Sequence, residues 1–511
     1  MPSYGTHKSV ILLANARFYR FDGSRGVWQR HAALAIEDGI IRSLDARDIG
    51  AGIERIDLDG AAVLPAFADC HVHLDGTGYF AGNRSLSAVR SYPQYADAVA
   101  RLPRDGPFLY AGQYDDGLWA DGRAADALPL ERYHANVRAM VVRIDSHSCI
   151  VNRNALAWFS LDPDTNGIER DAEGAPTGRL FFDANWRAQA AFMAAFPPSM
   201  RADAEARAID LALSRGALHL HAQLLGLPRD AYAEEVKRLR ASRAKVHPKI
   251  CEPNAQLALE LGLPYIGGDV FLDGSLGSCT AALCEPYVGD RGHGALRMSD
   301  DALLGYFAQA EALGIAAGVH AIGDAAIEQC IRTWERVLAG KPSQRGARHF
   351  IEHFEMASDE HIDACARMGI YLSMQPQFDA TWGDQGGMYD ERLGTSRKRR
   401  MNALARIARS GAVLCGGDDS PVCPLDPLAG MQACLDHHEP EQRLTAHEAL
   451  ALYTVNAARF GYAETHTGNL EPGLAADLVV LDRDPLDGAR FADCTVHQTW
   501  RDGKILFDIN K

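Results

Sequence analysis

The middle of the chain repeats one pattern: a helical stretch with an apolar stripe, a glycine, and a short apolar run that ends in polar residues. Gly216, Gly314 and Gly411 each follow such a helical stretch and precede such a run. Glycine commonly ends a helix because it adopts left-handed backbone angles without strain. Helices and strands that alternate from about residue 65 to about residue 465 predict repeated βα units, and hence a TIM-type barrel with insertions.

The two ends of the chain differ from the middle, because short apolar runs are joined there by tight turns. A strand is predicted over residues 9–18, and Asp38-Gly39 and Asp502-Gly503 each separate two apolar runs. Asp-Gly between apolar runs is a strong hairpin signal. We expect one β subdomain from residues 1–64 and 466–511, and a barrel from residues 65–465 with an insertion at about 75–200.

Composition excludes several classes of protein. The chain has 511 residues, 47% hydrophobic and 23% charged, as in ordinary globular proteins. A net charge of −15 argues against nucleic acid or anionic membranes as partners. No stretch has the roughly 18 apolar residues of a membrane span, and the polar first residues are not a secretory signal. The eleven cysteines lack CxxC spacing, so we expect a cytoplasmic protein without disulfides.

Polar residues cluster where predicted strands end. His71 and His73 are two residues apart, so both project from the same face of a strand. His320, His353 and Asp419 follow three later strands. Each has an ordinary structural explanation, as a helix cap, a core histidine or a turn acid. Together, at one topological position, they fit a divalent metal site better.

A set of ordered motifs runs through nearly the whole chain. They occupy residues 64–73, 145–152, 272–283, 320–326, 351–353, 417–422, 455–459 and 471–478. In this order the motifs resemble the amidohydrolase superfamily, specifically its amidohydrolase-3 (YtcJ-like) branch. The resemblance implies a metal-dependent (β/α)8 barrel with a β-sandwich made from both chain termini, which agrees with the pattern of strands and helices.

The resemblance also implies roles for the polar residues. His71 and His73 would bind the more buried metal ion, and His320 would be the ligand from strand five. His353 would be either a ligand or a group that polarises the substrate carbonyl. The family acid stands two residues before proline, which selects Asp419 over Asp418. Asp419 would bind metal, take a proton from the attacking water and deliver it to the leaving nitrogen.

Asp269 departs from the family pattern. Many relatives carry a lysine four residues before the Asp-Gly-Ser motif that begins at Asp273, and once carbamylated it bridges two metals. Aspartate there is either a ligand, with two metal ions bound, or faces away and pairs with an arginine, with one ion bound. Residues 269–273 resemble a strand, so an inward Asp269 would bring Asp273 with it. The metal expected is Zn, with Mn or Fe as alternatives.

The remaining candidates are substrate contacts. Those expected are Asp145, His147, His221, Asp273 and Gln375. Asp145 and His147 lie in the insertion, where they either form part of a lid or hold the insertion together. His221 ends a predicted strand, with His219 on the same face as the alternative.

These features predict a hydrolase that attacks a non-peptide C–N bond in an amide, carbamate or N-acyl group of a small molecule. One alternative is a heterocycle deaminase, which uses the same constellation. The other is a catalytically inactive, metal-free binding homologue. Because a β subdomain exposes strand edges, we expect a homo-oligomer, most simply a dimer.

Overall fold

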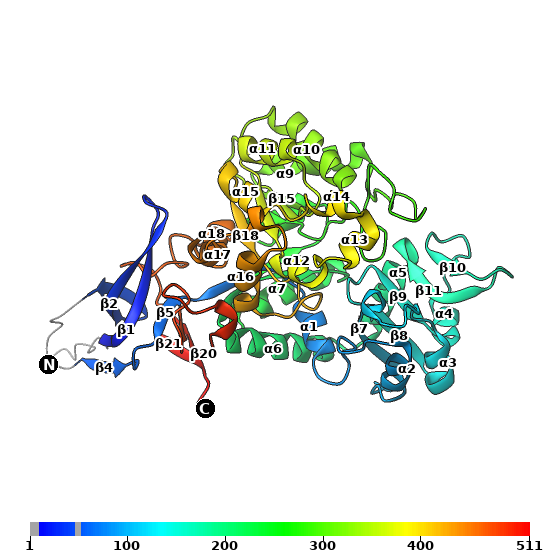
Figure 1. Cartoon of the computed structure of the whole chain (residues 1–511), viewed down its shortest axis with the longest axis horizontal. Helices are drawn as coiled ribbons and strands as arrows, with labels where there is room; N and C mark the ends of the chain where they lie inside the picture. The colour runs from blue at the N-terminus through cyan, green and yellow to red at the C-terminus, as the bar shows by residue number, and fades with distance from the viewer. Residues whose placement is uncertain (1–9, 46–52) are drawn as a thin grey trace.

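The computed structural model describes residues 10–45 and 53–511 (Figure 1). The start of the strand predicted from residue 9, and the polar N-terminal residues, lie outside them. The fold is mixed α/β, with a sheet from both ends of the chain on the left of Figure 1 and the insertion on the right. The repeated βα units lie between them.

Strands from both ends of the chain form one eight-stranded sheet. Its order is β21-β20-β19-β5-β1-β2-β3, with β4 beside β1. The strands are β1 (Val10–Asp22), β2 (Val27–Glu37), β3 (Ile40–Leu44), β4 (Glu54–Asp57), β5 (Ala62–Pro65), β19 (Leu478–Leu481), β20 (Val496–Arg501) and β21 (Lys504–Asp508). Antiparallel pairing of β5 with β19 joins the two ends of the chain.

Both predicted hairpins are confirmed. Asp38-Gly39 connects β2 to β3, and Asp502-Gly503 connects β20 to β21. All four residues have positive φ, from 49° to 83°, as a type I′ turn requires.

The middle of the chain supplies two parallel sheets. They are β13-β12-β6 and β14-β15-β16-β17-β18. The strands are β6 (Phe67–Val72), β12 (Ala217–Leu224), β13 (Lys245–Ile250), β14 (Tyr265–Ile266), β15 (Ala316–Ala321), β16 (Phe350–His353), β17 (Tyr371–Met374) and β18 (Leu414–Gly416). The outer edges of the two sheets are also bonded: Gly267 N donates to Ile250 O at 2.8 Å, and His73 N to Ser420 O at 2.8 Å.

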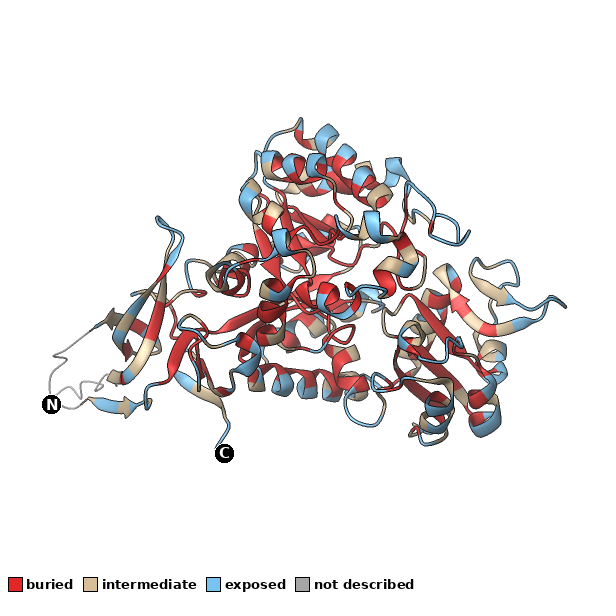
Figure 2. Cartoon of the chain, viewed as in Figure 1, coloured by how far each residue is buried: buried red, intermediate tan, exposed pale blue. Residues whose placement is uncertain are grey.

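Helices pack around these parallel strands, and Figure 2 shows the strands buried beneath exposed helix faces. They are α1 (Leu74–Phe80), α6 (Pro198–Ser214), α7 (Tyr232–Arg240), α8 (Ala255–Glu260), α9 (Asp300–Leu313), α10 (Asp324–Leu338), α11 (Asp359–Met368), α12 (Pro376–Trp382), α13 (Met388–Leu393), α14 (Thr395–Lys398), α15 (Leu404–Ser410), α16 (Pro427–Asp436), α17 (Ala446–Leu452) and α18 (Val455–Phe460). Gly314 and Gly411 end α9 and α15 in the left-handed region, as predicted.

The insertion has its own five-stranded sheet, ordered β10-β11-β9-β8-β7. Its elements are β7 (Phe108–Tyr114), β8 (Arg138–Arg143), β9 (Ser148–Val151), β10 (Ile168–Arg170), β11 (Pro176–Phe181), α2 (Tyr92–Ala100), α3 (Leu128–His134), α4 (Arg153–Phe159) and α5 (Phe182–Ala195). Ser91 and Asn152 begin α2 and α4 by accepting backbone N–H groups with their side chains. The insertion thus packs apolar clusters of its own beside the parallel strands.

Two predicted strands differ from the structure. The strand expected to end at His221 continues to Leu224. Residues 269–273 do not form a strand, and only Phe271 makes an isolated bridge, to His320. The chain turns there because the Asp273 carboxylate accepts the backbone N–H groups of Ala282, Ile322 and Gly323.

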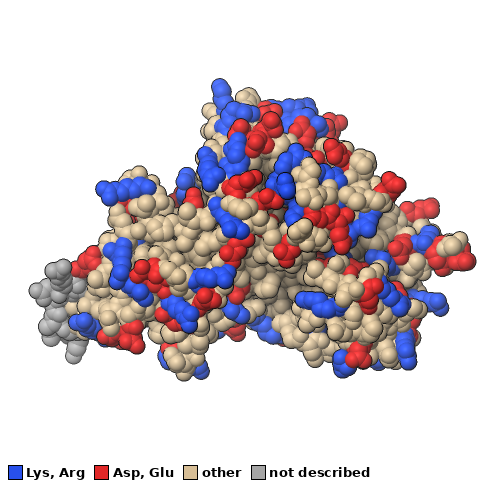
Figure 3. Space-filling model, in the orientation of Figure 1, with Lys and Arg blue, Asp and Glu red and all other residues tan. Residues whose placement is uncertain are grey.

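Charge is mixed on the surface. Figure 3 shows basic and acidic side chains interspersed over the visible face. None of the helices within residues 10–45 and 53–511 is both long and apolar enough to cross a membrane.

Candidate metal centre

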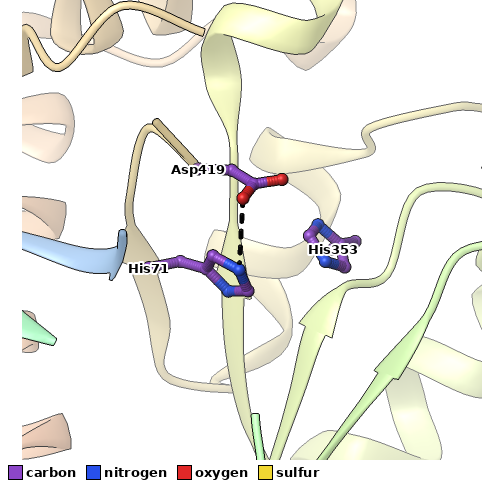
Figure 4. Close-up of side chains that lie close together, drawn as sticks. All are labelled: His71, His353 and Asp419. Atoms are coloured by element: carbon purple, nitrogen blue, oxygen red, sulfur yellow. Dashed lines mark ion pairs between the residues drawn. The ribbon is translucent and has the colours of Figure 1, made fainter. Parts of the chain in front are cut away.

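Two histidines and two carboxylates meet where β6 and β18 end. His73 Nε2 lies 3.1 Å from Asp269 Oδ2 and 3.1 Å from Asp419 Oδ1. His71 Nε2 lies 3.3 Å from each of the same two oxygens. Figure 4 shows the His71 and Asp419 side chains facing each other, with His353 beside them.

The second oxygen of Asp269 faces another pair of histidines. Oδ1 lies 3.6 Å from His320 Nδ1 and 3.7 Å from His353 Nε2. The Asp269 carboxylate therefore stands between the pair from β6 and the pair from β15 and β16. It does not face away to pair with an arginine, which was one of the two expectations. Three overlapping groups of these side chains could each hold a metal ion: His71, His353 and Asp419; His71, His73 and Asp269; and Asp269, His320 and His353.

Several atoms of this cluster have no hydrogen-bond partner among the described residues. They are His71 Nε2, His320 Nδ1, Asp269 Oδ1 and Asp419 Oδ1, and all four are buried. Buried polar atoms are rarely left without a partner. Imidazole nitrogens and carboxylate oxygens that converge in this way fit a divalent cation as the missing partner.

The other nitrogen of each of three histidines has a fixed contact. His71 Nδ1 lies 2.9 Å from Glu352 Oε2, His320 Nε2 is 3.1 Å from Gly274 O, and His353 Nδ1 is 2.8 Å from Gln375 Oε1. The oxygens of Gly274 and Gln375 place a proton on the outer nitrogens of His320 and His353, so the inner nitrogens can offer lone pairs to a metal. The Glu352 carboxylate faces the outer nitrogen of His71.

The backbone at the cluster is also unusual. His353 and Asp419 have φ of 70° and 52°. Residues with side chains rarely adopt this region, and such conformations concentrate at functional sites.

Electrostatics favour the protonated forms of His71 and His73 in the metal-free protein. Burial lowers the pKa of His73, but contacts with Asp269 and Asp419 outweigh burial and raise it to about 10. Burial acts on His71 in the same way, and the charges of Asp269 and Glu352 place its pKa well above the usual value. A bound cation would therefore displace protons from these histidines.

Three polar residues around the cluster were not predicted from the sequence: Gln223, Lys249 and Glu352. Lys249 Nζ donates to Cys70 O at 2.9 Å and to Glu352 Oε1 at 2.7 Å. Gln223 Nε2 lies 3.1 Å from His71 Nδ1. One signal could have pointed to Gln223: residues 219, 221 and 223 alternate on one strand face, so Gln223 continues the row of His219 and His221.

The expected substrate contacts fall into two groups, those that line the cavity beside the cluster and those that do not. Asp145 and His147 line the cavity beside the cluster. Gln375 contacts His353, and Asp273 is occupied by backbone N–H groups. His221 is stacked 4.6 Å from His247, and the cavity walls do not include it. Because its strand continues to Leu224, Gln223 rather than His221 contacts the histidine cluster.

Asp145 ties the insertion to the parallel-strand region. Its Oδ2 accepts Arg143 Nη1 at 2.6 Å within the insertion. The same oxygen accepts the Oγ atoms of Ser275 and Ser278, at 2.8 and 2.7 Å. Asp145 thus borders the cavity and also links the insertion to residues 275–278.

A cavity of about 490 Å³ opens beside the cluster. Its lining includes His73, Asp269 and Asp419 of the cluster, and aromatic side chains such as Tyr110 and Trp186. A side pocket of about 40 Å³ also borders His320, His353 and Asp419. The site can therefore hold a small organic molecule against the cluster.

A mixed α/β fold with a His/Asp cluster at the ends of parallel strands is the arrangement of the metal-dependent hydrolases. A family model described as "Amidohydrolase family" matches residues 54–507. The chain belongs to this family.

Individual proteins agree with this assignment. The chain is 30% identical over 521 residues to YtcJ of Bacillus subtilis, covering 94% of this chain and 96% of that protein. It is 24% identical over 513 residues to the N-substituted formamide deformylase of Arthrobacter pascens, covering 89% of this chain and 90% of that protein. An uncharacterized metal-dependent hydrolase from Pyrococcus furiosus has a similar structure, with 25% identity and a TM-score of 0.72, covering 94% of this chain and all of that one.

Proposed function

We propose that this protein hydrolyses a non-peptide C–N bond, in an amide, carbamate or N-acyl group of a small molecule. The observation that carries the proposal is the convergence of four histidines with Asp269 and Asp419 beside a cavity, with four of their buried atoms lacking hydrogen-bond partners among the described residues. The name of the related N-substituted formamide deformylase supports an N-acyl substrate.

The architecture proposed with this function is a (β/α)8 barrel. The hydrogen bonds at both outer edges of the two parallel sheets support closure of their eight strands. We propose residues 65–465 as the barrel, and residues 1–64 with 466–511 as a β-sandwich subdomain. In barrels of this kind, the active site lies at the carboxyl ends of the strands.

The proposed metal ligands are the residues that face one another in the cluster: His71, His73, Asp269, His320, His353 and Asp419. A divalent ion held there, Zn in the first instance and Mn or Fe as alternatives, would lower the pKa of water to about 7 and polarise a carbonyl group. Because the two oxygens of Asp269 face different histidine pairs, the six residues would suit two ions better than one.

Proton transfer is assigned to Asp419. Its Oδ1 is buried beside His71 and His73 without a hydrogen-bond partner, while its side chain borders the cavity. The contacts with the two histidines outweigh burial and keep the pKa of Asp419 well below its usual range, so it is an ionised base. Asp419 would accept a proton from water and return it to the leaving nitrogen.

His353 has two possible roles, and its contacts favour one of them. With Nδ1–H donating to Gln375 Oε1, the Nε2 atom that faces Asp269 has a lone pair and no proton to donate. This supports His353 as a ligand in the resting protein. His353 could polarise a carbonyl through Nε2 only if that nitrogen carried a proton to donate.

The test is a screen of N-acyl amines, carbamates and amides with the protein supplied with Zn, Mn or Fe, and with a chelated sample as the control. We expect release of a carboxylic acid and an amine that depends on metal. Ammonia released from a heterocycle would favour the deaminase alternative. A washed protein that retains no stoichiometric metal and hydrolyses nothing when metal is added would support the inactive homologue.

A further inference from the structure

The side pocket next to the metal cluster has a distinct chemical character. Its volume is about 40 Å³, and it shares His320, His353 and Asp419 with the metal cluster. The rings of Phe378, Trp382 and Tyr389 form a continuous wall, with centroids 5.1 and 6.5 Å apart in sequence order. Most of this lining is apolar or aromatic.

One carboxylate, that of Glu355, lies among these rings. Glu355 is 4% exposed, and its Oε2 accepts the Tyr389 hydroxyl at 2.7 Å. Among the described residues, Glu355 has no ion pair with a lysine or arginine, and the Tyr389 hydroxyl is the hydrogen-bond partner found for its carboxylate. Buried carboxylates normally have a cationic partner, because removal from water is costly.

The cation that does line the side pocket is already engaged. Arg143 contacts Asp145 at 2.6 Å, Asp115 at 2.5 Å and Asp116 at 3.2 Å. Of these three carboxylates, only that of Asp145 also lines the side pocket, and it pairs with Arg143. Glu355 therefore lies in a small aromatic space whose described lining offers no lysine or arginine free to pair with it.

An aromatic wall with one buried carboxylate suits a compact cation. Ring faces attract ammonium groups, most strongly where water is excluded. An ammonium group could also donate to Oε1 of Glu355, for which no hydrogen-bond partner is found in residues 10–45 and 53–511.

We propose that the side pocket is the subsite for a compact primary ammonium group attached close to the scissile carbonyl. On the proposed function, on which this inference rests, the substrate class is then an amide of a small amino acid, with the amino group in the side pocket. The larger cavity, with Tyr110 and Trp186 in its wall, would hold the amine portion.

The experiment compares two ligands of the same shape, glycinamide and propionamide, which differ by an ammonium group in place of a methyl group. Binding to the metal-loaded protein is measured by calorimetry at about pH 7, where an α-amino group is largely protonated. We expect glycinamide to bind at least ~10-fold more tightly, the order of a cation–π contact with a charge-assisted hydrogen bond. The preference should vanish in Glu355→Gln.

Asp75→Asn is the matched control. The Asp75 carboxylate lines the large cavity, where it pairs with Arg201 at 2.9 Å, and this variant should keep the preference. Equal binding of the two ligands by the wild-type protein, which needs no variant, would overturn the inference. So would a preference that persists in Glu355→Gln, since glycinamide would then be chelating the metal.

Turnover separates this inference from the proposed function. The glycyl and propionyl amides of one aromatic amine are supplied to the same metal-loaded protein. If both are cleaved equally well and glycinamide has no binding advantage, the hydrolase assignment stands and the ammonium subsite is refuted. If glycinamide binds through Glu355 but neither amide is cleaved, the subsite stands and the hydrolase assignment fails.

Discussion

Lys249 Nζ lies 2.7 Å from Glu352 Oε1, and neither side chain is exposed to solvent. The other oxygen of Glu352 is 2.9 Å from His71 Nδ1, so one carboxylate joins a buried lysine to a proposed metal ligand. Burial raises the pKa of Glu352, but Lys249 and His71 outweigh burial and lower it to about 2. Glu352 is thus ionised, and its negative charge lies beside the outer nitrogen of His71, where it supports ligation through Nε2.

The first prediction concerns this chain of contacts. Glu352→Gln should weaken metal binding by ~10–100-fold, as loss of a partner of a ligating histidine does. It should also cost about 3–5 kcal/mol of stability, because Lys249 is left buried without a counter-charge. Calorimetric metal titration and thermal unfolding measure the two effects.

A double variant and a control separate these effects. Lys249→Met combined with Glu352→Gln removes both charges, so stability should recover while metal binding stays weak. Glu311→Gln changes a similar contact, 3.0 Å from His349 Nε2 at the opposite end of β16, and should leave metal binding intact. Metal binding that is unaffected by Glu352→Gln would contradict the role given to Glu352.

The second prediction concerns the proposed base. Asp419→Asn keeps the shape of the side chain and removes its basicity, so we expect retained folding, largely retained metal and a rate lower by at least ~10²-fold. Asp418→Asn is the comparison. Asp418 accepts Gln377 Nε2 at 2.9 Å and Asp426 N at 2.7 Å, so its substitution should lower the melting temperature. If the Asp419→Asn protein is fully active and the Asp418→Asn protein is inactive, then Asp418 rather than Asp419 is the base.

The third prediction concerns the number of metal ions. Because Asp269 faces both histidine pairs, Asp269→Ala should reduce metal content from about two equivalents to one or fewer, with loss of activity. Metal analysis of washed protein measures this. One equivalent in both proteins, with activity kept, would indicate a single ion held by the remaining residues of the cluster.

The fourth prediction concerns pH. The pKa of His73 is raised to about 10, so in the metal-free protein this histidine is protonated at neutral pH and a metal ion must displace the proton. Metal affinity should therefore rise with pH from about 6 to 9, by roughly a factor of ten per pH unit for each proton released. Titration against a chelator of known affinity, with a pH indicator to count protons, measures both quantities. An affinity that is constant above about pH 7 would show that the histidines titrate near their ordinary value of about 6.5.

The fifth prediction concerns assembly. Strands β3 and β21 are the edges of the eight-stranded sheet, and exposed edges favour pairing with another chain. We expect a homodimer or larger assembly by light scattering at micromolar concentration. A strict monomer would refute this expectation.

The amino-acid sequence was sufficient where the signal is local. Asp38-Gly39 predicted a hairpin because both positions need positive φ, which this pair accepts readily. His71 and His73 were predicted to project together because residues two apart share a strand face. The mixed α/β fold followed from glycines that end helices before apolar strands, such as Gly314.

Only the tertiary structure decided which residues surround these positions. Residues 269–273 were expected to be a strand, yet Asp273 is held by backbone N–H groups of distant segments, and Asp269 faces the cluster from an irregular stretch. The Glu352 carboxylate contacts His71, and Glu355 meets Tyr389 in the side pocket. These partners lie far apart in sequence and belong to different elements. Periodicity and turn chemistry describe neighbours along the chain, whereas contacts between strands and loops depend on register and packing, which local pattern does not encode.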